Sequence, residues 1–238
     1  MIAIIPARSG SKGLVNKNIK SFLGKPLIYY TIKEALNSNY INRVIVSTDS
    51  PKIANISQKY GAEVPFLRPV KYASDNSPVY KSIIYTMDKL DEKYDEIILL
   101  QPTNPLRTAK MIDESIELFN NKDCISVISI SKKSEPLEWF KKIDKRGKLV
   151  EINNKENNKN NNRQNYDNIY LPNGMIYIVK YDYFIKEHRF YSDKTYPYIV
   201  EPKYAIDIDK EYEFRFAEMI YKQEMEYYND KDCNNNRK

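Results

Sequence analysis

Short apolar runs alternate with helix-forming segments along the first half of the chain, and this alternation constrains the fold more than any other feature. It is typical of a sheet whose parallel strands are joined by crossover helices. Uninterrupted runs such as IILL indicate strands that are buried on both faces. We therefore expect an α/β fold with a single doubly wound, mostly parallel sheet of the Rossmann-like type. The strands predicted in this half are IAIIP (2–6), RVIVST (43–48), AEVPF (62–66), EIILLQ (96–101) and CISVISI (124–130).

Residues that start helices lie between these runs. Pro26 begins a helix that continues to Leu36, Ser50 and Pro51 begin one that ends at Gly61, and Thr108 caps one over 109–119. Each predicted helix connects two predicted strands, as a doubly wound sheet requires.

The alternation stops after Ile130. Residues 132–170 form an excursion from the sheet, with a turn at 145–148 and a low-complexity run of asparagine at 153–165 that we expect to be mobile. Strands at 174–180 and 204–209 then return the chain to the sheet. A closing helix over 211–228 completes one domain, 1–228, and we predict that the tail, 229–238, is disordered.

Composition excludes several classes of protein. No apolar run approaches the roughly 20 residues that cross a bilayer, and the N-terminus lacks the basic region of a signal peptide. We therefore expect a cytoplasmic protein with no membrane partner. The net charge is +6, but the lysines are scattered among asparagine, isoleucine and tyrosine, so we expect no nucleic-acid partner. The two cysteines have neither metal-site nor disulfide spacing.

The loop after the first predicted strand, ARSGSKGLVNKNI (7–19), has the composition of an anion site. It fits neither the Walker nor the dinucleotide glycine pattern. Its glycines nevertheless allow backbone N–H groups to turn toward an anion, its serines add hydroxyl donors, and Arg8, Lys12 and Lys17 add charge. The loop is a candidate polyphosphate site, and the alternative is an ordinary basic surface loop.

Ligands of open parallel sheets bind beyond the carboxyl ends of the strands, where this chain is polar. Ser47, Thr48 and Asp49 end the second run, and QPTNPLR (101–107) ends the fourth. Asp207 and Asp209, in the sequence DID, would share one face of a strand and could hold Mg²⁺ together with substrate phosphates. Alternatively, they could complement the positive end of the helix that follows.

Six stretches, in order, resemble the cytidylyltransferases that activate sialic acid and related nine-carbon sugar acids as CMP conjugates. They are IIPARSGSKGLVNKNI, VSTDS, YGAEVPFLRP with ASD, LLQPTNPLR, PNGMIYI and IDID, from Ile2 to about Tyr221. The resemblance implies a nucleotidyltransferase fold that transfers CMP from CTP to the anomeric hydroxyl of a sialic, legionaminic or related acid. It also implies release of pyrophosphate and a requirement for Mg²⁺.

The resemblance further implies roles for individual residues. The catalytic charges would be Arg8, Lys12 and Lys17. The nucleotide would be bound by Arg8, Ser11, Lys12, Asn18, Arg68 and Ser77. The sugar acid would be bound by Gln101, Arg107, Arg163 and Asn173, and the metal by Asp207 and Asp209. The family also implies a homodimer in which the segment from Trp139 to Asn165 reaches the partner.

Two departures from the family pattern concern the sugar. Leu171 stands where sialate-specific members often carry an arginine, and Glu138 stands near the place of a lysine. We therefore expect a diacetamido sugar such as legionaminic acid to be preferred. The octulosonate cytidylyltransferases are an alternative, although their loop usually continues differently from SKGLVNKN. A basic RNA-binding module is another, but it needs basic residues clustered on one face and leaves DID unexplained.

Overall fold

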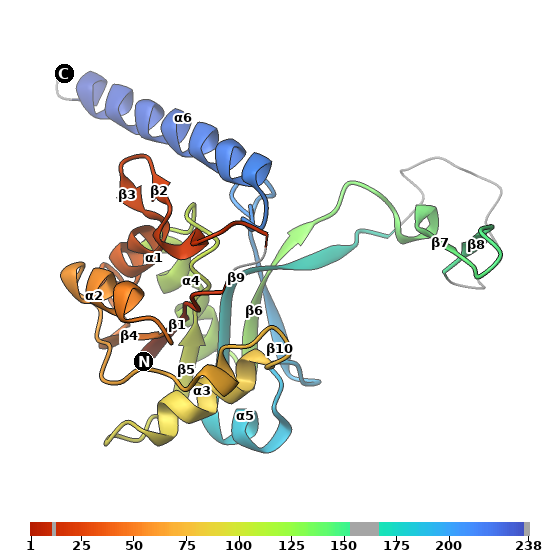
Figure 1. Ribbon diagram of the computed structural model, residues 1–238. Helices are drawn as coiled ribbons and strands as arrows, with labels where there is room; N and C mark the ends of the chain where they lie inside the picture. Colours follow the sequence, from red (N-terminus) through yellow and green to blue (C-terminus); the bar gives the residue numbers. More distant parts are fainter. Residues whose placement is uncertain (11–12, 153–166, 236–238) are drawn as a thin grey trace.

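The computed structural model describes residues 1–10, 13–152 and 167–235. Within them, six strands form the central sheet, in the order β10-β6-β9-β5-β1-β4 (Figure 1). β1 is parallel to β4 and β5, β6 is parallel to β10, and β9 runs antiparallel between β5 and β6. The predicted mostly parallel sheet is therefore confirmed. Its strands are β1 (Ile2–Pro6), β4 (Arg43–Ser47), β5 (Glu96–Leu99), β6 (Ser126–Lys132), β9 (Tyr170–Lys180) and β10 (Thr195–Ile199).

Helices cover both faces of this sheet. Alternate side chains of β1 separate the two cores: Ala3 and Ile5 face the helices of one layer, and Ile2 and Ile4 face the other. The first layer contains α1 (Leu27–Leu36), α2 (Pro51–Lys59) and α4 (Ala109–Asn121). The second contains α3 (Val79–Asp88) and α5 (Tyr181–Glu187).

The predicted helix starts are confirmed. The Ser50 hydroxyl accepts a hydrogen bond from the Ile53 amide at 3.4 Å, and the Thr108 hydroxyl accepts one from the Met111 amide at 3.2 Å. The short helices η1 (Lys17–Ile19), η2 (Val70–Tyr72) and η3 (Leu137–Trp139) lie in connections.

The closing helix, α6 (Glu211–Asn235), packs on a small hairpin formed by β2 (Ser21–Phe22) and β3 (Lys25–Pro26). Phe22 meets Phe214 edge to face, with ring centroids 5.4 Å apart. The helix continues to Asn235, beyond the end at residue 228 that we predicted, and the disorder of the tail stays a prediction. No glycine or proline interrupts the sequence from 211 to 235, so nothing in it ends the helix earlier. None of the helices among the described residues combines the length and apolarity needed to cross a bilayer.

Two predicted strands are wrong. In AEVPF only Glu63 bridges the sheet, opposite Ile45, and Pro65 has no N–H to extend the pairing. Residues 204–209 are not part of a strand either, although the Ile208 amide donates to the Thr103 carbonyl at 3.0 Å.

The excursion forms an arm that extends away from the sheet (Figure 1). Its hairpin pairs β7 (Lys141–Ile143) with β8 (Leu149–Glu151) around the predicted turn, where Gly147 has φ = +78°. Ile143 and Leu149 pair across the hairpin and are 72% and 73% exposed. The asparagine run lies in 153–166, outside the described residues.

Candidate active site

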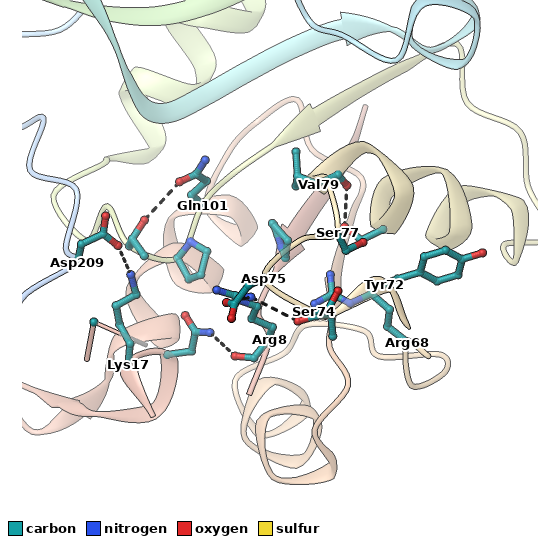
Figure 2. A pocket seen from close by; sticks show the side chains of 17 residues that line it. Arg8, Lys17, Arg68, Tyr72, Ser74, Asp75, Ser77, Val79, Gln101 and Asp209 are labelled. Carbon is teal, nitrogen blue, oxygen red and sulfur yellow. Dashed lines mark hydrogen bonds and ion pairs between the residues drawn. The ribbon is translucent and has the colours of Figure 1, made fainter. Parts of the chain in front are cut away.

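A cavity of about 550 Å³ opens beyond the carboxyl ends of β1 and β5 (Figure 2). The predicted site residues that line it are Arg8, Lys17, Asn18, Arg68, Ser77, Gln101 and Asp209. They come from the first loop, the segment before α3, the loop after β5 and the segment before α6. The fold thus brings together side chains that are up to 201 positions apart, from Arg8 to Asp209 (209 − 8).

Two side chains fix the start of the basic loop. The carboxylate of Asp49 accepts hydrogen bonds from the Ser9 amide at 2.9 Å and the Ser9 hydroxyl at 2.6 Å. The amide of Asn18, which is only 5% exposed, donates to the Arg8 carbonyl at 3.0 Å. Asn18 therefore lines the cavity and also holds the loop backbone. Ser11 and Lys12 lie outside the described residues.

Lys17 joins this loop to the segment before α6. Its ammonium group donates to the Ile208 carbonyl at 2.6 Å and to the Asp209 carboxylate at 2.7 Å, the pair drawn in Figure 2. Gly13 allows the loop to lie close to the segment before α6, because a Cβ at this position would lie 2.4 Å from the Asp209 carbonyl oxygen. Only glycine fits there without a shift of backbone.

Two arginines contribute positive charge to the cavity, one in an ion pair and the other buried with an unpaired Nε. Arg8 is half exposed, and its guanidinium pairs with the Asp75 carboxylate at 2.6 Å. Arg68 is 5% exposed, and its Nε has no hydrogen-bond partner among the described residues. Burial lowers the pKa of Arg68, and the charge of Asp49 opposes the shift. A buried guanidinium that lines a cavity and lacks a partner is suited to bind an anion. The hydroxyl of Ser77 also lacks a partner within the described part of the chain.

Asp207 and Asp209 flank Ile208, which is buried, in the segment before α6. The Asn104 amide donates to Asp207 at 3.2 Å. Burial raises the pKa of the Asp207 carboxyl, the Thr103 hydroxyl opposes the shift, and the negative charge of Asp209 adds to it. This pair of carboxylates would be stabilised by a cation.

The start of the helix that follows has a capping side chain of its own. The Glu213 carboxylate accepts hydrogen bonds from the backbone amides of Asp209 and Lys210 at 2.7 and 2.8 Å. No group of three or more metal-binding His, Cys, Asp or Glu side chains occurs in the described ranges. Two carboxylates nevertheless fit Mg²⁺, which takes its other ligands from water and substrate phosphates.

A second cavity, of about 360 Å³, shares Gln101 with the first and contains Asn173 and Asp207. The Asn173 amide is held at both ends: its oxygen accepts from the Ser129 hydroxyl at 2.6 Å, and its nitrogen donates to the Ser131 hydroxyl at 2.9 Å. These contacts lie where the pairing of β6 and β9 is irregular. One N–H of the amide is left for a ligand.

Arg107 is 2% exposed, and its guanidinium donates to the Met175 carbonyl and the Thr31 hydroxyl, both at 2.6 Å, and to the Gln101 carbonyl at 3.0 Å. These contacts indicate that Arg107 positions the backbone behind the second cavity, and its contact with the sugar acid stays a prediction. Arg163 lies outside the described residues.

Sequence reasoning missed two cations. Lys132 and Lys133 line the second cavity, at the carboxyl end of β6. The rule that led us to inspect the ends of the other strands would have found them in ISISKK. Asn104 was missed as well, since only the folded chain places it beside Asp207.

Known proteins similar to this chain show its family. The family model described as cytidylyltransferase matches residues 2–233. A CMP-N,N'-diacetyllegionaminic acid synthase of Legionella pneumophila is 36% identical over 92% of this chain and 95% of its own length. An N-acylneuraminate cytidylyltransferase of Escherichia coli is 33% identical over 91% of this chain, which spans 51% of that relative.

Solved structures support the fold independently. A CMP:2-keto-3-deoxy-manno-octonic acid synthetase complexed with CTP superposes with a TM-score of 0.69 over 94% of this chain and 98% of its own. Its sequence identity is 16%, so this likeness concerns the fold alone. The family match covers nearly all of the residues that form the sheet and the cavities. This chain therefore belongs to the cytidylyltransferase family, as a nucleotidyltransferase related to the enzymes that activate nonulosonic acids.

Proposed function

We propose that this protein transfers CMP from CTP to the anomeric hydroxyl of a nonulosonic acid and releases pyrophosphate. One observation carries the proposal: a basic cavity lined by Asp209 adjoins, at Gln101, a second cavity lined by Asp207. The first cavity suits a nucleoside triphosphate, and the second leaves room for an acceptor beside it. The names of the relatives supply the chemical class of that acceptor.

In the proposed reaction, the anomeric oxygen of the sugar acid forms a bond to the α-phosphorus of CTP. The bond from that phosphorus to the bridging oxygen breaks, pyrophosphate leaves with the electron pair, and the hydroxyl proton passes to solvent. Lys17, Arg8 and Arg68 would neutralise the phosphates, and Gln101 would orient the acceptor at the junction of the cavities. Positioning and charge neutralisation are the main sources of rate acceleration in such transfers.

Mg²⁺ is the proposed cofactor, with Asp207 and Asp209 as its protein ligands. When bound, it would neutralise charge that develops on the phosphates. The negative charge of Asp209 close to Asp207 and the position of Asp209 on the nucleotide cavity support this assignment.

A homodimer and a cytoplasmic location are also part of the proposal. The exposed apolar residues of the arm, Trp139, Phe140, Ile143 and Leu149, support self-association because they leave apolar surface in contact with water.

A diacetamido sugar acid is the proposed acceptor. Leu171 lines the second cavity, so an apolar group stands where the family resemblance places a charged one. The legionaminic acid synthase named above is consistent with this choice.

The test is pyrophosphate release by the purified protein with CTP, Mg²⁺ and a panel of acids. The panel contains N-acetylneuraminic, N,N'-diacetyllegionaminic, pseudaminic and 3-deoxy-manno-octulosonic acids. We expect the diacetamido acid to have the highest kcat/KM. A tenfold preference for N-acetylneuraminic acid would overturn the choice of sugar, and release with octulosonate alone would overturn the nonulosonic class.

A further inference from the structure

The second cavity contains a carboxylate that would repel the carboxylate of an acidic acceptor. Asp207 lines it, and a sugar acid brings a second negative charge. The cations among the described lining residues are Lys132 and Lys133. We infer that Lys132 and Lys133 bind the carboxylate of the acceptor, an inference that rests on the proposed function.

The two ammonium groups are available for such a ligand. Neither takes part in an ion pair within the described ranges of the chain, and both side chains are exposed. Their backbone, in contrast, is fixed. Lys132 pairs with Tyr170 in the β6–β9 ladder, and the Lys133 amide donates to the Ile169 carbonyl at 3.0 Å. A fixed backbone with unpaired cations is suited to recognise an anion at a defined place.

The direction of the strand points to Lys133 as the main contact. The hydroxyl of Ser131 accepts a hydrogen bond from Asn173, so the Ser131 side chain lies on the side of the strand that faces the cavity. Lys133 directly follows the last residue of β6, and its amide still donates to the Ile169 carbonyl, so we expect the alternation to continue and to place Lys133 on that side. Lys132 would then contribute positive charge from the rim of the cavity.

The inference also accounts for the departures from the family pattern. Leu171 removes a positive charge from the second cavity, and Glu138, on the arm, adds a negative one nearby in sequence. Lys132 and Lys133 would restore the positive charge that an acidic acceptor requires, at different positions of the chain.

The experiment combines enzyme variants with two forms of the acceptor. Lys133→Gln, Lys132→Gln and the double variant each remove charge and keep a side chain of similar size. Lys59→Gln, on the exposed surface of α2, is the matched control. Each protein is assayed with the free nonulosonic acid and with its methyl ester, as substrate or as competitive inhibitor. Melting temperatures and the KM for CTP are measured in parallel.

We expect Lys133→Gln to raise the KM for the acid about tenfold, the scale of one charge-assisted hydrogen bond. The double variant should raise this KM by more than about tenfold. The KM for CTP and the KM or inhibition constant of the ester should change by no more than about twofold, and the melting temperature should change little. An active wild-type enzyme whose lysine variants lose acid and ester binding equally, or lose neither, would overturn the inference alone. A wild-type enzyme that releases no pyrophosphate with any acid of the panel would overturn the proposed function and this inference with it.

Discussion

At the residue scale, two buried arginines show how similar side chains serve opposite purposes. The Nε of both Arg107 and Arg68 lacks a hydrogen-bond partner among the described residues, but the terminal nitrogens of Arg107 donate to three protein acceptors. The first contributes to the fold, because its removal leaves buried acceptors unpaired. The second lines the open cavity, and the charge of Asp49 opposes the effect of its burial only in part, so its place is suited to an anionic ligand.

Replacing each arginine by methionine tests this difference. Arg107→Met should lower the free energy of unfolding by about 3 kcal/mol, because the buried Met175 carbonyl and Thr31 hydroxyl lose their donor. Arg68→Met should leave stability unchanged or raise it, and should increase the KM for CTP about tenfold or more. Urea denaturation and steady-state kinetics on both proteins provide the readout. Equal losses of stability in the two variants would contradict the assignment.

The aspartate pair gives a second prediction at this scale. Asp209→Asn removes one negative charge and keeps the volume, so kcat should fall about a hundredfold and half-maximal activity should need more Mg²⁺. The Asp209 side chain is 71% exposed, and the melting temperature should therefore change little. Mg²⁺ titrations of activity for Asp207→Asn and Asp209→Asn measure both effects. Near-normal kcat at an unchanged Mg²⁺ optimum would contradict the metal assignment.

At the scale of elements, the basic loop and the segment before α6 form one unit. Gly13 lies against the Asp209 carbonyl, whereas a Cβ at Gly10 would meet nothing within 4 Å. Gly13→Ala must therefore displace backbone on one side or the other, and should lower kcat/KM for CTP about tenfold or more. Gly10→Ala is the comparison and should lower kcat/KM for CTP by no more than about threefold. A larger loss in Gly10→Ala than in Gly13→Ala would show that this contact does not organise the site.

Sequence patterns predicted most of the elements that carry the site, for identifiable reasons. The strands β1, β4, β5 and β6 are continuous apolar runs, and Ser50 and Thr108 cap helices through local hydrogen bonds. Local signals failed where tertiary contacts decide the structure. AEVPF has strand propensity, yet Pro65 limits its pairing. β10 includes a proline and the exposed Tyr196, which conceal a strand at the edge of the sheet.

The site was predictable to a similar extent. Motifs predicted Arg8, Lys17, Asn18, Arg68 and Gln101 as site residues. The folded chain brings these residues around one cavity. The motifs could not show that Arg107 is buried, because its partners include the carbonyl of Met175, 68 residues away. Polar groups of the backbone carry no sequence signature, so a positioning role is visible only in the folded chain.

At the scale of the whole molecule, the arm exposes apolar side chains that the rest of the single chain does not cover. Ile143 and Leu149 would be covered in a dimer, and we predict sedimentation as a dimer at micromolar concentration. Replacing both by aspartate should shift the protein to monomer, whereas Lys145→Gln, in the turn of the hairpin, should not. A monomeric wild-type protein would contradict the prediction.

The central claim is transfer of CMP, and the stoichiometry of the products tests it most directly. The purified protein is incubated with CTP, Mg²⁺ and N,N'-diacetyllegionaminic acid, and the CMP–sugar conjugate and pyrophosphate are quantified together. The account predicts one pyrophosphate for each conjugate, and far slower turnover with ATP or GTP because a purine exceeds the space for a cytosine. Release of pyrophosphate with free CMP and no conjugate, or equal turnover of all three nucleotides, would contradict it.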